Sequence, residues 1–150
     1  MFTGWHHTNI NVSNLDRSLD FYTNVLGLTV ADETEFAGDE FTQGTGLPGA
    51  KIRAAFLEAP NSSTILEMFQ YVAPDSRPIP KNAVANDIGV GHICFQVEDI
   101  DQTYEKLSKQ DVEFVSPPVT ISKEHPKGAG ARFCYFRDPD GILIEILQLP

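Results

Sequence analysis

Polar and apolar residues alternate near the N-terminus, and a helical pattern follows the alternation. Residues 7–12 begin with His7 and place polar and apolar side chains on opposite faces, as in a half-buried strand. Ser13 is then the expected N-cap of a helix, because apolar residues recur at helical spacing from there to Gly27, where the helix is expected to stop. Residues 28–30, 51–57 and 64–70 are predicted strands. The first part of the chain therefore predicts a β-α-β-β-β unit, with a polar, glycine-rich loop over residues 31–50.

A second unit of the same order follows from residue 91. Its first strand opens with His92, Asp99 caps the next helix, and an Asp-Gly turn joins the last two strands. The predicted strands after the helix are 112–115, 131–137 and 142–148. Residues 73–90 contain three prolines at their start and no periodicity, so they are expected to form an extended connector. We expect one domain over residues 1–150, with module one at about 4–72 and module two at about 91–150.

The two units match at particular residues. The sequence around His7 returns 85 positions later around His92, and the strand carrying Glu67 returns 78 positions later in the strand carrying Glu145. Each of these strands is almost wholly apolar apart from its glutamate. A carboxylate in such a strand is rarely buried without a partner or a metal ion. The repeat therefore singles out two histidines and two glutamates at equivalent places.

Composition narrows the range of functions. The 150 residues carry a net charge of −10, and their few basic side chains are scattered, which argues against nucleic-acid binding. No apolar run approaches the roughly 20 residues that span a bilayer, and no signal peptide is visible, so we expect a cytoplasmic protein without a membrane partner. Cys94 and Cys134 are interpreted as buried thiols, with a disulfide left open.

The four repeated residues form a candidate metal site. If a pseudo-two-fold axis relates the units, their first and last strands would bring two imidazoles and two carboxylates to one point. Such a set suits a divalent ion of Zn, Ni, Mn, Co or Fe. A single histidine at a strand start is usually an ordinary core or surface residue, so the prediction depends on the whole set. Its members are His7, Glu67, His92 and Glu145.

The chain resembles the vicinal oxygen chelate superfamily, which holds glyoxalase I, methylmalonyl-CoA epimerase, extradiol dioxygenases, fosfomycin-resistance enzymes and bleomycin-resistance proteins. Residues 7–27, 91–107 and 136–145 carry the resemblance. It implies an α+β fold in which two tandem βαβββ modules form a curled mixed sheet around a central metal. It also implies that the four residues named above occupy the family's ligand positions, and that the protein is a homodimer.

The four-ligand pattern resembles glyoxalase I and differs little from the epimerase. The resemblance implies a small carbonyl-containing substrate whose α-proton moves through a metal-bound enediolate or enolate, with Glu67 or Glu145 as the base. Arg53 is a candidate for holding an anionic group of the substrate, and Phe69 lies on the predicted face of Glu67, where it favours a substrate with apolar bulk. Residues 68–72 do not resemble the glutathione-contacting stretch of glyoxalase I, which leaves open whether glutathione or coenzyme A is part of the substrate.

Two alternatives remain open at this point. An extradiol-type dioxygenase would hold Fe(II) with His7, His92 and Glu145, and would use Tyr135 and His125 in catalysis. In that scheme Glu67 is an additional anionic ligand at a position that oxygen chemistry needs open. A metal-free small-molecule binding or resistance protein is the second alternative.

The segment from residue 121 to 130 is polar and rich in glycine. It is interpreted either as a cover that brings His125 and Lys127 to the substrate or as an ordinary surface loop.

Overall fold

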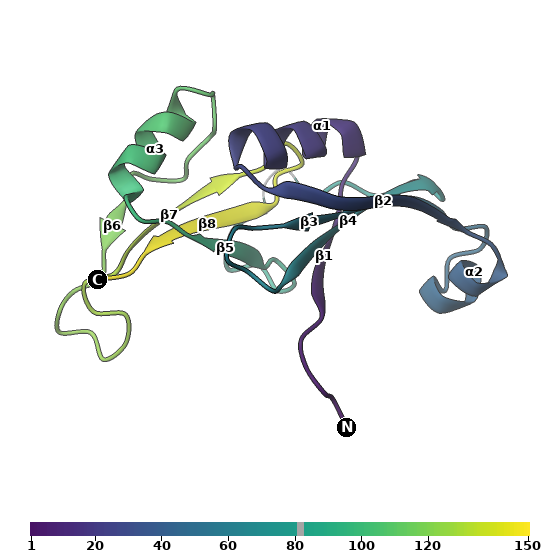
Figure 1. The fold of residues 1–150 in the computed structure, drawn as a ribbon, viewed down its shortest axis with the longest axis horizontal. Helices are drawn as coiled ribbons and strands as arrows, with labels where there is room; N and C mark the ends of the chain where they lie inside the picture. Colours follow the sequence, from purple (N-terminus) through teal and green to yellow (C-terminus); the bar gives the residue numbers. More distant parts are fainter. Residues whose placement is uncertain (81–82) are drawn as a thin grey trace. The chain divides into compact units, whose positions relative to one another are not determined.

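The chain folds into two compact units, Met1–Pro78 and Ile79–Pro150. The computed structural model describes residues 1–80 and 83–150, and its elements are shown in Figure 1. The division falls inside the predicted connector, of which residues 81–82 lie outside the described residues. The predicted α+β class with two repeated modules is confirmed, with one four-stranded mixed sheet in each unit.

The first unit has a sheet in the order β1-β4-β3-β2. The first and last strands, β1 and β4, are parallel neighbours, whereas β3 is antiparallel to both β2 and β4. A helical segment, α1 followed by the π-helical turn η1, connects β1 to β2 (Figure 1). The elements are β1 (His7–Asn11), α1 (Leu15–Asp20), η1 (Phe21–Val25), β2 (Thr29–Ala37), α2 (Asp39–Thr45), β3 (Lys51–Glu58) and β4 (Ile65–Ala73).

The second unit repeats this topology with shorter elements. Its sheet has the order β5-β8-β7-β6, in which β5 and β8 are parallel and the other pairs are antiparallel. The elements are β5 (His92–Gln96), α3 (Ile100–Ser108), β6 (Val119–Thr120), β7 (Arg132–Arg137) and β8 (Leu143–Gln148). In both units the helix therefore links the first strand to an edge strand, and the last strand returns beside the first.

The core of each unit lies between the helix and one face of the sheet. In the first unit, Leu15 of α1 is buried together with strand residues such as Leu57 and Met68. In the second, Ile100 of α3 is buried with Phe136 and Ile144. Side chains alternate along a strand, so these residues lie on the helix side. The opposite face of each sheet carries His7, Glu67, His92 and Glu145, and in the first unit it also carries the buried apolar residues Ile52 and Ala54.

Helix starts and the first helix differ in part from the sequence predictions. Asp99 caps α3 as expected, and its side chain accepts a hydrogen bond from the Gln102 amide. In the first unit the cap is Asn14 rather than Ser13, because Asn14 Oδ1 accepts from the Arg17 amide at 2.9 Å. The helix then widens at Phe21, whose carbonyl accepts from the Leu26 amide, so the predicted single helix is two segments.

The segment predicted as a loop over residues 31–50 is largely ordered secondary structure. It contains most of β2 and all of α2. Because β2 is an edge strand with exposed side chains along most of its length, it lacks the apolar alternation by which strands are recognised. The predicted strand 112–115 is reduced to an isolated bridge between Phe114 and Phe136. Cys134 is buried as predicted, whereas Cys94 is exposed and both thiols are free.

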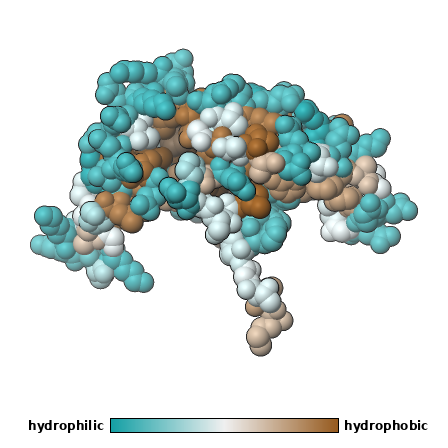
Figure 2. All heavy atoms as spheres, in the orientation of Figure 1, coloured by the Kyte–Doolittle hydropathy of each residue, from teal (hydrophilic) through white to brown (hydrophobic). Residues whose placement is uncertain are grey.

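Figure 2 shows hydrophilic side chains over most of the visible face, with apolar ones between them. The chain before β1 runs away from the sheet of its own unit (Figure 1), and its apolar side chains Phe2 and Trp5 are exposed. Among residues 1–80 and 83–150, every helix is too short or too polar to traverse a bilayer.

Candidate functional site

The first unit brings His7 and Glu67 together across the parallel pair β1 and β4. His7 Nε2 lies 3.4 Å from Glu67 Oε2. Asn9 is the direct strand partner of Glu67 and donates a hydrogen bond from Nδ2 to the same oxygen at 3.0 Å. Glu67 is 8% exposed, so a charged group is held at the edge of a protein interior. The carboxylate thus has one amide donor and one imidazole as polar partners.

The second unit brings His92 and Glu145 together in the same way. His92 Nε2 lies 2.9 Å from Glu145 Oε2. Cys94 on one side and Tyr135 on the other are the strand partners of Glu145, and each makes a side-chain hydrogen bond with it. The Tyr135 ring also meets the His92 ring edge-on, with centroids 5.3 Å apart. This carboxylate is surrounded by a hydroxyl, a thiol and an imidazole.

The Cys94 thiol and the Tyr135 hydroxyl keep their protons beside Glu145. Although Cys94 as a whole residue is exposed, its thiol is partly buried, and this burial raises the pKa of the thiol to about 12. The charge and hydrogen bond of Glu145 act in the same direction. The pKa of the Tyr135 hydroxyl is raised for the same reasons in the same order. Both groups are therefore hydrogen-bond donors to Glu145 at neutral pH rather than anions.

Sequence reasoning found Tyr135 but missed Asn9 and Cys94. Each of them lies two residues after the histidine of its unit, on the same strand face and opposite the glutamate of the neighbouring strand. Strand alternation together with the repeat offset of 85 was sufficient to find both. The repeat does not single out Asn9 and Cys94, because asparagine and cysteine are different residue types at equivalent positions.

Each His–Glu pair has a spacing that suits two neighbouring ligands of one metal ion. With bonds of about 2.1 Å, two ligand atoms are about 3.0 Å apart at a right angle and about 3.4 Å apart at a tetrahedral angle. The observed separations, 2.9 and 3.4 Å, match these values. Within the described residues 1–80 and 83–150, no group of three or more His, Cys, Asp or Glu side chains is arranged to hold a metal ion, so Cys94 beside Glu145 does not complete such a group. Each unit therefore offers two ligands.

Arg53 lies on the other face of its sheet. It is the strand partner of Gln70, which is three residues beyond Glu67 and points to the helix side. There its guanidinium forms two hydrogen bonds with Asp16 of α1, at 2.8 and 3.2 Å. The Arg53 partner holds the pKa of the Asp16 carboxyl below its usual value through hydrogen bonding and charge. The structure thus does not bring Arg53 to Glu67.

The same arrangement is present in the second unit. Arg132 makes a two-bonded pair with Asp101 of α3, one of its bonds being 2.8 Å. The strand glutamine takes part in both units by accepting the first amide of the helix at 2.9 Å, with Gln70 bonded to Leu15 and Gln148 to Ile100. We call each set a polar clamp, made of Asp16, Arg53 and Gln70 in the first unit and of Asp101, Arg132 and Gln148 in the second. The clamps fasten each helix start to the two strands beside it.

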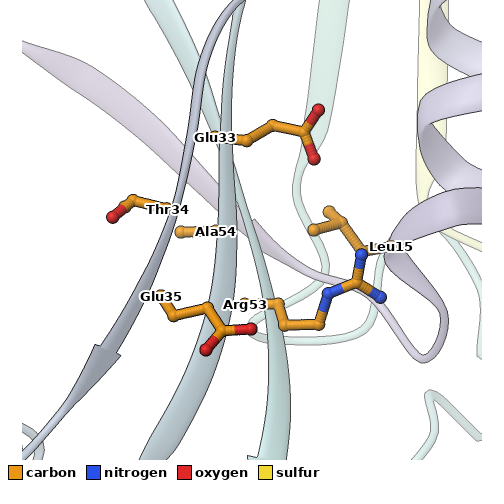
Figure 3. Close-up of a pocket in the computed structure, with 6 residues that line it drawn as sticks. All are labelled: Leu15, Glu33, Thr34, Glu35, Arg53 and Ala54. Atoms are coloured by element: carbon orange, nitrogen blue, oxygen red, sulfur yellow. The ribbon is translucent and has the colours of Figure 1, made fainter.

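A shallow depression of about 240 Å³ lies beside the first clamp (Figure 3). Its lining includes Leu15, Arg53, Glu33 and Glu35, and Figure 3 shows the Arg53 side chain between the two glutamates. Hydrogen bonding to Asp16 raises the pKa of Arg53, and the negative charges of Asp16, Glu33 and Glu35 act in the same direction. The guanidinium is thus already matched by carboxylates of its own unit.

The remaining predicted site residues fall in two places. Phe69 lies two residues after Glu67 on the same face of β4, half-buried beside other aromatic rings. His125 and Lys127 lie in the exposed loop between β6 and β7, where His125 Nδ1 is 2.8 Å from the Lys127 carbonyl oxygen. The structure thus places Phe69 next to a candidate ligand, whereas the roles of His125 and Lys127 stay predictions.

Known proteins are similar to the whole chain. A family model described as the glyoxalase/bleomycin resistance protein/dioxygenase superfamily matches residues 4–146. A 2-epi-5-epi-valiolone epimerase from an Actinomyces species is 35% identical over 97% of this chain and 79% of its own length. The lactoylglutathione lyase of Pseudomonas aeruginosa is 29% identical over 96% of this chain and 81% of its own length.

A solved structure agrees with these matches. A glyoxalase family protein from Bacillus cereus superposes with a TM-score of 0.85 at 25% identity, covering 99% of this chain and 95% of its own. The two relatives named above are enzymes, one an epimerase and the other a lyase.

Proposed function

Because the chain belongs to the glyoxalase/bleomycin resistance protein/dioxygenase superfamily, we propose that it is a divalent-metal-dependent enzyme of the glyoxalase I and epimerase type. It moves a proton at the carbon next to the carbonyl group of a small substrate. The observation that carries this proposal is the presence, in both units, of a histidine nitrogen and a glutamate oxygen at the spacing of two metal ligands. The similarity to an epimerase and to a lyase supports the same reaction class.

His7, Glu67, His92 and Glu145 are the proposed ligands of one divalent ion. When bound, such an ion withdraws electrons from a carbonyl oxygen and stabilises the negative charge that develops there. In each unit Nε2 is the imidazole atom that lies next to the glutamate, so it is the proposed metal-binding atom. Titration with Zn, Ni, Mn, Co and Fe, described below, would identify the ion.

The two glutamates are the proposed proton carriers. A carboxylate held within reach of a substrate proton can act as a general base. Glu67 has a single amide donor, Asn9, whereas Glu145 has the donors Tyr135 and Cys94. If one glutamate removes the proton and a second group returns it with inversion of the carbon, the reaction is that of an epimerase. If the same glutamate returns it to the neighbouring carbon, the product is an isomer of the glyoxalase type.

A dioxygenase is the second candidate, and Tyr135 is the observation that favours it. The resemblance to extradiol enzymes implies a catalytic role for Tyr135, and its hydroxyl bonds to Glu145 while its ring meets His92. In that reaction Tyr135 would be an acid–base group next to a catechol. Ring cleavage of catechols by Fe(II)-loaded protein, with uptake of oxygen, would distinguish it from proton transfer.

The test of the main proposal begins with metal stoichiometry. Purified protein is stripped with a chelator and titrated with each of the five ions, and bound metal is measured by elemental analysis. One ion per chain is expected. Two ions per chain would mean that each pair binds separately, and no uptake by a folded protein would overturn the proposal in favour of a metal-free binding protein.

The second step of the test measures proton transfer directly. Each metal form is incubated in D₂O with hemithioacetals, α-hydroxy ketones and acyl-CoA esters, and NMR follows deuterium entering the position next to the carbonyl. Exchange detects proton removal even where no net product accumulates. Metal-dependent exchange with at least one class is expected, and its absence from all three, in a protein that binds one ion, would contradict the proposed chemistry.

A homodimer and a cytoplasmic location stay predictions from the sequence and its resemblance. Sedimentation of the metal-loaded protein would measure the first.

A further inference from the structure

Four aromatic rings follow one another on the first unit. Phe69 and Tyr71 of β4 meet at a centroid distance of 6.4 Å, Phe36 of β2 meets Phe69 at 5.9 Å, and Phe41 of α2 stacks on Phe36 at 4.6 Å. All four are half-buried, so part of each ring is open to solvent. We call this surface the aromatic strip; its members are Phe36, Phe41, Phe69 and Tyr71.

The aromatic strip lies on the same face of the sheet as Glu67. Along β4, Phe69 and Tyr71 are two and four residues beyond Glu67, so their side chains leave the strand on the same side. Across the sheet, Phe69 pairs with Ala54, and Ala54 pairs with Thr34, two residues before Phe36. The strip therefore begins beside the proposed metal ligand and extends across the sheet to α2.

The residues beside the strip are a small buried one on the sheet and an exposed helix at its end. Ala54, between Phe69 and β2, is buried and offers only a methyl group. Helix α2, which supplies Phe41, has no buried residue and is flanked by Gly38 and Gly46, both at positive φ. A core aromatic residue normally hides its ring, but here stacked rings keep open edges next to a buried carboxylate.

We propose that the aromatic strip binds an apolar ring attached to the carbonyl group on which the enzyme acts. The proposal rests on the function proposed above and specifies its substrate class: a carbonyl compound with a ring substituent, rather than one with a methyl group or a flexible chain. A ring stacks on Phe69 and Phe36 in the offset or edge-on arrangements that aromatic groups favour, and it loses little conformational freedom when bound. Glu67 and its hydrogen-bond partner Asn9 lie at the β1 end of the strip, where the reacting end of such a substrate would be.

The experiment uses hydroxamates, which chelate divalent ions without being turned over. Benzohydroxamate, hexanohydroxamate and acetohydroxamate carry a ring, a flexible chain and a methyl group on the same chelating end. Calorimetry on the metal-loaded protein gives the three dissociation constants. We expect benzohydroxamate to bind at least about tenfold more tightly than acetohydroxamate and more tightly than hexanohydroxamate, because the chain must be ordered on binding. Equal binding of ring and chain would overturn the proposal.

Substitution identifies the surface responsible. Phe41→Ala and Phe36→Leu should each reduce the preference for the ring by about three- to tenfold while leaving acetohydroxamate binding unchanged. Phe21→Ala is the matched control, because Phe21 is a half-buried aromatic residue of η1, outside the strip. A loss of ring preference as large in this control as in the two strip variants would contradict the assignment.

A separate measurement distinguishes failure of this inference from failure of the metal site. If no hydroxamate binds, the metal proposal fails, and the strip is then tested in metal-free protein with benzamide and acetamide. NMR signals of the four rings should shift with benzamide and not with acetamide. Rings that respond to neither amide would overturn the inference by itself.

Discussion

The two units share a framework and differ around their carboxylates. Both place a histidine and a glutamate on parallel first and last strands, and both fasten their helix with a polar clamp of the same composition. The neighbours of the glutamate are different. Glu67 lies between Asn9 and Phe56, whereas Glu145 lies between Cys94 and Tyr135.

This difference shows which parts of the repeat are fixed by folding. In both units the clamp satisfies a helix amide and pairs an exposed carboxylate, so it serves the same structural purpose twice. The groups beside the glutamate are not repeated between the units. Divergence makes the two carboxylates unequal, which suits a reaction in which one removes a proton and the other holds or returns it.

The segments between the second and third strands also diverge. In the first unit this segment contains α2, with Phe41 as its contact to the sheet. In the second it is the loop with His125 and Lys127. One unit therefore presents aromatic rings and the other presents charged or titratable groups, so we expect the first to select apolar parts of a substrate.

Removing the carboxylates should have the largest effect. Glu67→Gln and Glu145→Gln are each expected to lower deuterium exchange by about 10²–10⁴-fold, the usual contribution of a general base. Comparing the two shows which glutamate is the base, because the variant that lacks it should lose more exchange at full metal loading. Glu58→Gln, an exposed position at the end of β3, is the control. Exchange that survives both substitutions unchanged would refute the proposed roles.

Substituting the aromatic residue beside each glutamate tests whether the different surroundings of the two carboxylates matter for catalysis. Tyr135→Phe removes a hydroxyl bonded to Glu145 and should lower exchange by about tenfold, since a hydrogen bond to a charged group contributes about 1.5–3 kcal/mol. Phe56→Tyr offers the equivalent hydroxyl to Glu67. If catalysis depends on the different surroundings of the two glutamates, Phe56→Tyr should also lower the rate of deuterium exchange. Wild-type exchange rates in both variants would show that Phe56 and Tyr135 have no catalytic role.

Breaking the clamps should affect stability alike in both units. Arg53→Met and Arg132→Met are each expected to lower Tm by a few degrees, whereas Lys109→Met, which removes an exposed helix pair with Glu105, should change it less. Exchange per folded molecule should be unchanged in Arg53→Met. If KM rises in that variant alone, Arg53 contacts the substrate as the sequence first suggested.

Acid should weaken the clamps in a predictable direction. Arginine hydrogen bonds lower the pKa of Asp16 and Asp101 in the folded state. Their contribution to stability is therefore present above the unfolded pKa of about 3.9 and is lost as pH falls through the lower, folded value. Asp16→Asn and Asp101→Asn should flatten this acid-side loss in unfolding curves recorded between pH 2 and 5, and an unaltered slope would contradict the assignment.

Changes in the loop of the second unit should have the smallest effect. His125→Ala and Lys127→Ala are expected to raise KM by at most a few-fold and to leave kcat unchanged, because both side chains are exposed. Steady-state kinetics on the best substrate of the exchange panel measures this. No change in KM in either variant would identify an ordinary surface loop.

The repeat made most of the fold predictable, because His7 and His92 head strands of the same pattern and Asp99 caps its helix as expected. Prediction failed where local pattern was weak. The edge strand β2 has no buried face. Ser13 and Asn14 are adjacent and both are residue types that cap helices, so the sequence pattern does not decide between them. The widened turn at Phe21 has no signature in residue type.

The candidate site was predictable only in part for a similar reason. The four residues follow from the repeat, and in the structure a histidine and a glutamate lie together within each unit. The gathering of all four at one metal ion stays a prediction. The position of Arg53 on the helix side required the register of β3 against β4, which single-strand alternation does not fix. The aromatic strip depends on α2, which sequence reasoning did not recognise.

Parallel pairing of the first and last strands has a consequence for how the protein folds. Each His–Glu pair forms only after a unit has closed a loop of nearly its full length, and such long-range closure is slow because its entropic cost comes before its contacts. A metal ion held by these residues would bind the native chain and not the unfolded one. It would then slow unfolding more than it speeds folding, so the loaded protein should owe its lifetime to a raised unfolding barrier.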